Sequence, residues 1–123
     1  MQQAILLAQK AEAQGEVPVG ALIVKNNEII GEGFNQPIQS HDPTAHAEII
    51  ALRNAAKNMQ NYRLTGTTLY VTLEPCLMCV GAMQHARIEA LVFGAHDNSV
   101  DAQVCEKFSH PGAGGNLRVT GGI

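Results

Sequence analysis

Residues 67–79 read TTLYVTLEPCLMC and join a strand-like run to a proline and two cysteines. The run TTLYVTL (67–73) is rich in residues that favour extended backbone, which predicts a strand. Pro75 favours the start of a helix, which we expect over residues 76–86. IEALVFGA (88–95) predicts a further strand. This strand–helix–strand order favours an α/β fold, in which a mixed sheet is covered by helices on both faces.

The other elements are predicted from apolar spacing and turn residues. Asn26 and Asn27 tolerate positive φ and suit a tight hairpin turn between two strands. Thr44 can cap the helix that follows it. In chain order we expect a helix at 2–14, strands at 19–25 and 28–34, a loop at 35–43, a helix from Thr44 to about Gln60, a short helix at 101–107 and a last strand at 117–120.

Length and composition limit the class of protein. The 123 residues suit one domain, and 46% of them are apolar, which is enough for a core. No run reaches the ~18 apolar residues of a membrane span, and the first residues lack a basic start and a cleavage site. We therefore expect a cytoplasmic protein with no membrane association. Three cysteines argue for metal or redox chemistry, and a net charge of -3 gives no overall sign of nucleic-acid binding.

The P-C-x-x-C motif predicts half of a metal site. Cys76 and Cys79 are three residues apart, so both sulfurs can face one point from a helix. The positive end of the helix dipole favours thiolates there, and the thiolate is the metal-binding form. Two thiolates leave a zinc site incomplete, because such sites use three or four protein ligands.

The stretch TAHAEII (44–50) supplies the missing parts. His46 is the best third ligand, because it too is expected in the first turn of a helix that follows a loop. A His-Cys-Cys site leaves one position for water, whose pKa zinc lowers toward ~7. Glu48 would then lie beside that water without binding zinc and would move its proton. A lone C-x-x-C is common, and a lone H-x-E is usually a solvated helix start. The combination of the two motifs is the sequence signature of zinc-dependent nucleobase deaminases, and that group of enzymes is the standard example of the signature.

Longer segments resemble the family of bacterial tRNA-specific adenosine deaminases, in the cytidine and deoxycytidylate deaminase superfamily. The resemblance extends from about Ile5 to Ile123. It is carried by EVPVGALIV (16–24), GEGFN (31–35), HDPTAHAEIIALR (41–53), MQNYRLTGTTLYVTLEPCLMCVGAM (59–83) and RIEALVFGA (87–95).

The resemblance implies a cytidine-deaminase-like fold of three layers, α/β/α, around a central mixed five-stranded sheet. It implies a single deaminase domain over residues 1–123 that is short at both ends relative to the family. The implied reaction is the zinc-dependent hydrolysis of adenosine to inosine at the wobble position of a tRNA anticodon stem-loop. The implied assembly is a homodimer with one zinc ion per subunit.

Site residues are carried over by their place in the matching motifs. The implied zinc ligands are His46, Cys76 and Cys79, with Glu48 as the proton shuttle. The implied substrate contacts are Asn35 and the backbone of Ala47, with Val19 and Leu73 as pocket walls. As isolated residues, Asn35 would be a turn residue and the last two would be core.

RNA contacts are predicted from fewer signals. Asp97 and Asn98 are candidates for the sugar–phosphate backbone, although a simple turn explains them equally well. Arg63 is the best candidate among the basic residues, and His110 before a proline is a possible phosphate contact.

Two other functions compete with this interpretation. A deaminase of a free base or nucleoside, of guanine or cytosine type, would share the fold and the metal motifs. A zinc-stabilised binding module without catalysis would also keep the ligands, but it has no use for Glu48.

Overall fold

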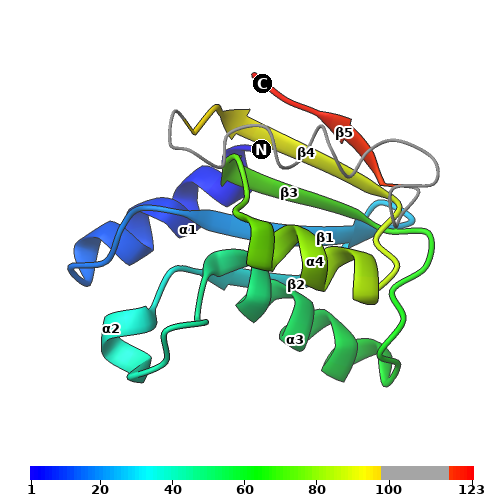
Figure 1. Ribbon diagram of the computed structural model, residues 1–123, viewed down its shortest axis with the longest axis horizontal. Helices are drawn as coiled ribbons and strands as arrows, with labels where there is room; N and C mark the ends of the chain where they lie inside the picture. The colour runs from blue at the N-terminus through cyan, green and yellow to red at the C-terminus, as the bar shows by residue number, and fades with distance from the viewer. Residues whose placement is uncertain (98–116) are drawn as a thin grey trace.

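The computed structural model describes residues 1–97 and 117–123, and its core is one five-stranded sheet (Figure 1). The strand order is β2-β1-β3-β4-β5. The pairs β1–β2 and β1–β3 are antiparallel, whereas β3–β4 and β4–β5 are parallel. The strands are β1 (Gly20–Lys25), β2 (Glu28–Phe34), β3 (Thr68–Leu73), β4 (Ala90–Ala95) and β5 (Arg118–Thr120). The predicted mixed sheet and its strands are confirmed.

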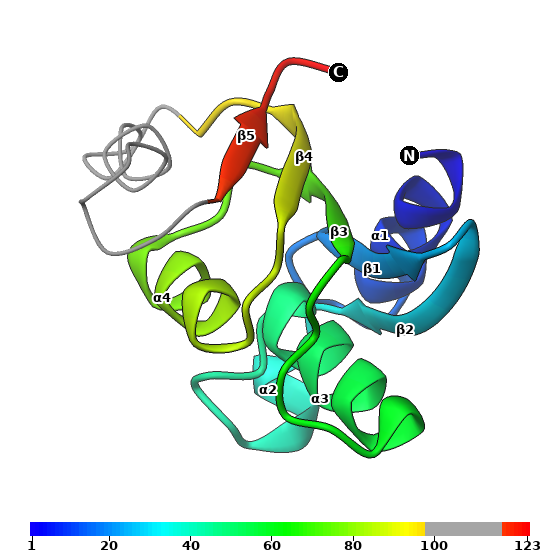
Figure 2. The same cartoon turned by 90° about the vertical axis from the view of Figure 1, so that its right-hand side faces the viewer.

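Helices cover both faces of this sheet (Figure 2). They are α1 (Gln2–Ala13), α2 (Pro37–Ser40), α3 (Ala47–Met59) and α4 (Leu77–His85). The backbone of Gly20 touches α1, and that of Gly33 touches α3 on the opposite face, so closely that a Cβ at either position would overlap the helix backbone. The three-layer α/β/α prediction is therefore confirmed.

The main core lies between the sheet and the pair α3 and α4. Alternate residues of the central strands point into it, as period-two side-chain geometry requires. Its fully buried large side chains include Ile23, Leu69, Val71, Met83 and Leu91. Within residues 1–97 and 117–123, no helix has both the length and the apolar character that a bilayer crossing needs.

The expected loop at 35–43 is wrong in part, because it contains the short helix α2. Pro37 begins this helix, where its fixed φ is favourable. The buried carboxylate of Glu16 accepts hydrogen bonds from the N–H groups of Ile38 and Gln39, at 3.2 and 2.9 Å. A cap supplied from more than twenty residues away stabilises a helix that local sequence does not predict.

The predicted cap at Thr44 is also wrong. The N–H and hydroxyl of Thr44 both donate to Asp42, at 2.9 and 2.8 Å, so Thr44 belongs to the preceding turn. The N-cap position is His46, and α3 begins at Ala47. The short helix expected at 101–107 lies outside the described residues.

Candidate functional site

The three expected metal ligands meet at the ends of two helices. His46 Nδ1 lies 3.6 Å from Cys76 Sγ and 3.5 Å from Cys79 Sγ, and the three ligand atoms all lie within 4.8 Å of one another. The helices α3 and α4 run side by side in the same direction over one face of the sheet (Figure 1). Their N-terminal ends therefore open at the same place.

Two of these residues precede their helices, although we expected both in a first turn. His46 is the N-cap of α3 and Cys76 the N-cap of α4, both with extended backbone. Cys79 lies in the first turn of α4 and is fully buried. An N-cap side chain and one three residues later both turn toward the helix start, so the C-x-x-C spacing still brings the sulfurs together.

The donor set fits zinc. Two thiols and an imidazole are the ligands that zinc prefers, and three protein ligands leave a position for water. The hydrogen bond with the Cys79 side chain is the main reason that the pKa of Cys76 falls from 9.0 to about 5, and the same bond together with burial raises the pKa of Cys79. One thiolate is therefore present at neutral pH before any metal binds, and metal binding would release the second proton.

Glu48 is a buried carboxyl in the first turn of α3, with 4% of its surface exposed. Burial is the main reason that its pKa is raised from 4.5 to about 6, and the Cys76 thiolate adds to this effect. A carboxyl that titrates near neutral pH can both take and return a proton. Such a shift beside a group of metal-type ligands is typical of catalytic sites.

Asn35 connects the end of β2 to the start of α3. Its Oδ1 accepts a hydrogen bond from the N–H of Ala47 at 2.9 Å. Because Oδ1 already accepts a hydrogen bond from the backbone, the Nδ2 group is the part of the side chain that can donate to a ligand. Sequence reasoning missed this capping role; asparagine is a preferred cap, but here it acts from twelve residues away.

The two expected pocket walls lie in the same region. The carbonyl of Val19 accepts a hydrogen bond from the Asn35 N–H at 3.0 Å, and the Val19 side chain is buried. Leu73 is the last residue of β3, three residues before Cys76, and is packed partly buried against the core.

Two of the expected RNA contacts, Arg63 and Asp97, lie within the described residues, at different ends of the molecule relative to the ligands. Arg63 lies between the C-terminal end of α3 and the start of β3, which is the other end of α3 from His46. Its guanidinium is 5.5 Å from the ring centre of Tyr62. Asp97 follows β4 near the ligand end of the sheet. Asn98 and His110 lie outside the described residues.

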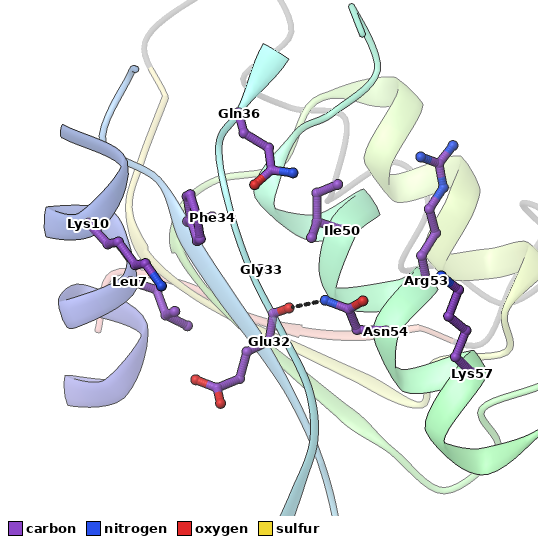
Figure 3. Close-up of a pocket in the computed structure, with 10 residues that line it drawn as sticks. All are labelled: Leu7, Lys10, Glu32, Gly33, Phe34, Gln36, Ile50, Arg53, Asn54 and Lys57. Carbon is purple, nitrogen blue, oxygen red and sulfur yellow. Dashed lines mark hydrogen bonds between the residues drawn. The ribbon is translucent and has the colours of Figure 1, made fainter. Parts of the chain in front are cut away.

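A groove of about 480 Å³ lies elsewhere, along the outer edge of β2 between α1 and α3 (Figure 3). Its cations are Lys10, Arg53 and Lys57. Glu32 also lines the groove, and Asp42 lies 3.5 Å from Arg53, so the acidic groups offset much of this charge. None of the metal-type ligands lines the groove. The donor chemistry, and not the size of a cavity, locates the candidate site.

Comparisons with known proteins agree with this site. Residues 1–95 match the family model of the cytidine and deoxycytidylate deaminase zinc-binding region. A tRNA-specific adenosine deaminase of Haemophilus influenzae is 64% identical over 103 residues, which is 83% of this chain and 60% of that protein. The chain spans between 60% and 66% of the length of three bacterial relatives of this kind.

Two solved structures have the same fold. One, from a study of A-to-I editing by tRNA:A34 deaminases at the wobble position of transfer RNA, is 39% identical, with a TM-score of 0.91 over 99% of this chain and 90% of that one. The other, a guanine deaminase of Bacillus subtilis, is 35% identical, with a TM-score of 0.77 over 95% of this chain and 79% of that one. The chain therefore belongs to the cytidine and deoxycytidylate deaminase family.

Proposed function

We propose that this chain converts adenosine to inosine at the wobble position of a tRNA anticodon stem-loop, by zinc-dependent hydrolysis in the cytoplasm. The observation that carries the proposal is the meeting of His46, Cys76 and Cys79 beside the buried carboxyl of Glu48. The names of two bacterial relatives, both tRNA-specific adenosine deaminases at 61% and 64% identity, support adenosine in tRNA as the substrate.

The three ligands would hold one zinc ion per subunit, and Glu48 would move protons. Bound zinc supplies a Lewis acid that lowers the pKa of water. Glu48 would take one proton from the attacking water and give it to the ring nitrogen, which keeps it. It would then take the second proton, from the hydroxyl now on C6, and give it to the amino group, which leaves as ammonia. Burial of Glu48 keeps bulk water from competing for these protons. A pKa of about 6 allows both transfers near neutral pH.

Asn35 would bind the base. With Oδ1 held by the Ala47 N–H, its Nδ2 group donates to an acceptor on the purine edge. The Ala47 backbone would face the base, with Val19 and Leu73 as walls of the pocket. The base must leave its stack to reach the zinc, so a single-stranded anticodon loop is the suitable substrate. All four RNA contacts, Asp97, Asn98, His110 and Arg63, stay predictions; the place of Asp97 after β4, bonded to Glu74, supports its inclusion.

We also propose that two chains associate through α3 and α4. A groove of about 450 Å³ lies on these helices and is lined mainly by apolar atoms, with Leu52, Ala56 and Ala82 among its residues. Burial of such a surface would favour association. Sedimentation of Ala82→Arg should show a monomer where the parent sediments as a dimer. Ile29→Arg, a matched change on the β2 edge, should leave the dimer intact.

A guanine deaminase is the second candidate, because the Bacillus subtilis structure shares the fold at 35% identity. One assay separates the two functions. The zinc-loaded protein is incubated with an anticodon stem-loop that carries adenosine at the wobble position, and inosine is detected by mass spectrometry. Free adenosine, guanine and cytosine are tested in parallel, and Glu48→Ala is the matched control.

We expect inosine from the stem-loop alone and none with the Glu48→Ala protein. Turnover of a free base without turnover of the stem-loop would replace the tRNA proposal with a salvage function. If the folded, zinc-loaded protein turns over none of these substrates, the proposal of an active deaminase is wrong, and a zinc-stabilised binding module becomes the better account.

A further inference from the structure

Glu74 is a second buried carboxylate at the ligand end of the sheet, and the proposed chemistry does not use it. It is 6% exposed and lies between the last residue of β3 and the N-cap Cys76. It is not one of the three grouped ligands. A buried carboxylate requires hydrogen-bond partners, because its removal from water is otherwise costly.

Glu74 interacts with the segment that follows β4 in the chain. Its Oε1 accepts a hydrogen bond from the N–H of Asp97 at 3.1 Å, and the same oxygen lies 3.6 Å from His96 Nδ1. The Glu74 N–H donates to the carbonyl of Ala95 at 2.9 Å. Glu74 therefore contacts each of the residues 95–97: its backbone N–H bonds to the first, and its carboxylate interacts with the second and third.

His96 of this segment also contacts β4, and β4 in turn contacts the C-terminal residue. The ring of His96 packs edge-on against Phe93, with the ring centres 5.0 Å apart. The carbonyl of Phe93 accepts a hydrogen bond from the N–H of Ile123 at 3.3 Å. The segment after β4 is thus fixed between Glu74 and β4, so a change at Glu74 would alter its position more than the packing of the core.

This arrangement follows from the parallel pairing of β3 and β4, in which Leu73 pairs with Ala95. Parallel strands end at the same edge, where ligands bind in α/β sheets. The chain after β3 leads to Cys76, and the chain after β4 leads to Asp97, the predicted RNA contact.

We propose that Glu74 is a positioning residue for RNA: it fixes residues 95–97, and Asp97 in particular, relative to the zinc ligand Cys76. This inference rests on the proposed function. The RNA backbone is then held at a set distance from the base pocket, without any contact between Glu74 and RNA. Charge-assisted hydrogen bonds to backbone N–H groups are among the stronger ones, which suits this task.

The test compares Glu74→Ala with Glu74→Gln in the zinc-loaded full chain. The alanine variant removes the acceptor, whereas the glutamine side chain keeps a carbonyl oxygen for the Asp97 N–H. Glu89→Ala is the control, because Glu89 is a glutamate next to β4 whose carboxylate pairs with Arg118 at the surface.

Three assays are compared: hydrogen exchange at the Asp97 amide, binding of the stem-loop (Kd), and the kinetics of inosine formation (KM and kcat). For Glu74→Ala we expect about tenfold faster exchange and about tenfold higher Kd and KM, as for a lost hydrogen bond to a charged group. Zinc content should match the parent, and kcat should stay within about threefold of it. Glu74→Gln and Glu89→Ala should resemble the parent in all three.

Parent-like exchange and Kd in Glu74→Ala would overturn the inference. Loss of zinc from that variant would also overturn it, since Glu74 would then support the metal ligands. If Glu74→Ala does not fold, His96→Ala is used instead, because it removes one exposed partner of the Glu74 carboxylate. For this variant we expect about threefold faster exchange and about threefold higher Kd. Parent-like values would overturn the inference. Amide exchange and the Kd can be measured even if no inosine forms. Failure of the proposed function can therefore be distinguished from failure of the inference about Glu74.

Discussion

Substitution of Asn35 separates its structural role from its role in binding the base. In the structure, Asn35 Oδ1 accepts a hydrogen bond from the N–H of Ala47, the first residue of α3, and Ala47 is fully buried. The N-cap residue His46 makes no side-chain capping bond of its own. Asn35→Ala therefore leaves a buried N–H without this acceptor. Asn35→Asp keeps an oxygen there and places a negative charge near the positive end of α3.

The expected loss of stability follows from that single bond. Loss of a cap costs about 0.5–2 kcal/mol, and an unsatisfied buried N–H costs about 1–3 kcal/mol. The two ranges overlap at about 1–2 kcal/mol. An unfolding entropy of about 2.1 cal/mol/K per residue gives roughly 0.26 kcal/mol/K for a chain of this length. Asn35→Ala should therefore lower the Tm by about 4–8 °C, and Asn35→Asp should lower it less.

The assay is thermal unfolding, followed by circular dichroism on zinc-saturated proteins, together with kcat/KM on the stem-loop. Both variants lack the Nδ2 donor, so both should lose activity to a similar extent, although only the alanine variant loses the cap. A parent-like Tm for Asn35→Ala would refute the capping role. An aspartate variant as unstable as the alanine variant would show that the oxygen atom is not what stabilises α3.

Three further predictions follow from the same structure. His46→Ala and Cys76→Ser each remove one of three ligands, so zinc content measured by mass spectrometry should fall sharply; full occupancy would contradict the ligand assignment. The raised pKa of Glu48 predicts that this carboxyl by itself lowers the stability of the metal-free protein by about 2 kcal/mol as pH rises from 4.5 through about 6, because a buried group must ionise. The lowered pKa of Cys76 acts in the opposite direction, so the difference between the parent and Glu48→Gln is the quantity to measure. Urea unfolding should show Glu48→Gln gaining that amount over the parent between pH 4.5 and 7, whereas a constant difference would contradict the burial argument. Gly20→Ala would press a methyl group against the Ala4 carbonyl and should cost about 1–3 kcal/mol in urea unfolding, and a parent-like midpoint would argue against tight docking of α1.

Elements that depend on local preferences were predictable from sequence. The strands β1, β3 and β4 are apolar runs, and the hairpin turn at Asn26 and Asn27 has φ values of 52° and 65°, as expected for residues that tolerate positive φ. The start of α3 and the presence of α2 were not predictable in this way. Each depends on a side chain from another segment, Asn35 in one case and Glu16 in the other.

The donor types and their spacing could be read from residue type and local order alone, because zinc preference and helix-start geometry are local properties. The tertiary fold was needed to show that His46 Nδ1 lies 3.6 Å from Cys76 Sγ and 3.5 Å from Cys79 Sγ, and that Glu48 is buried close to these ligands. Sheet order decided the neighbours of Glu74, since only the parallel pairing of β3 with β4 brings Asp97 to it. Burial and long-range hydrogen bonds arise between segments that are far apart in the chain, so no local sequence pattern predicts them.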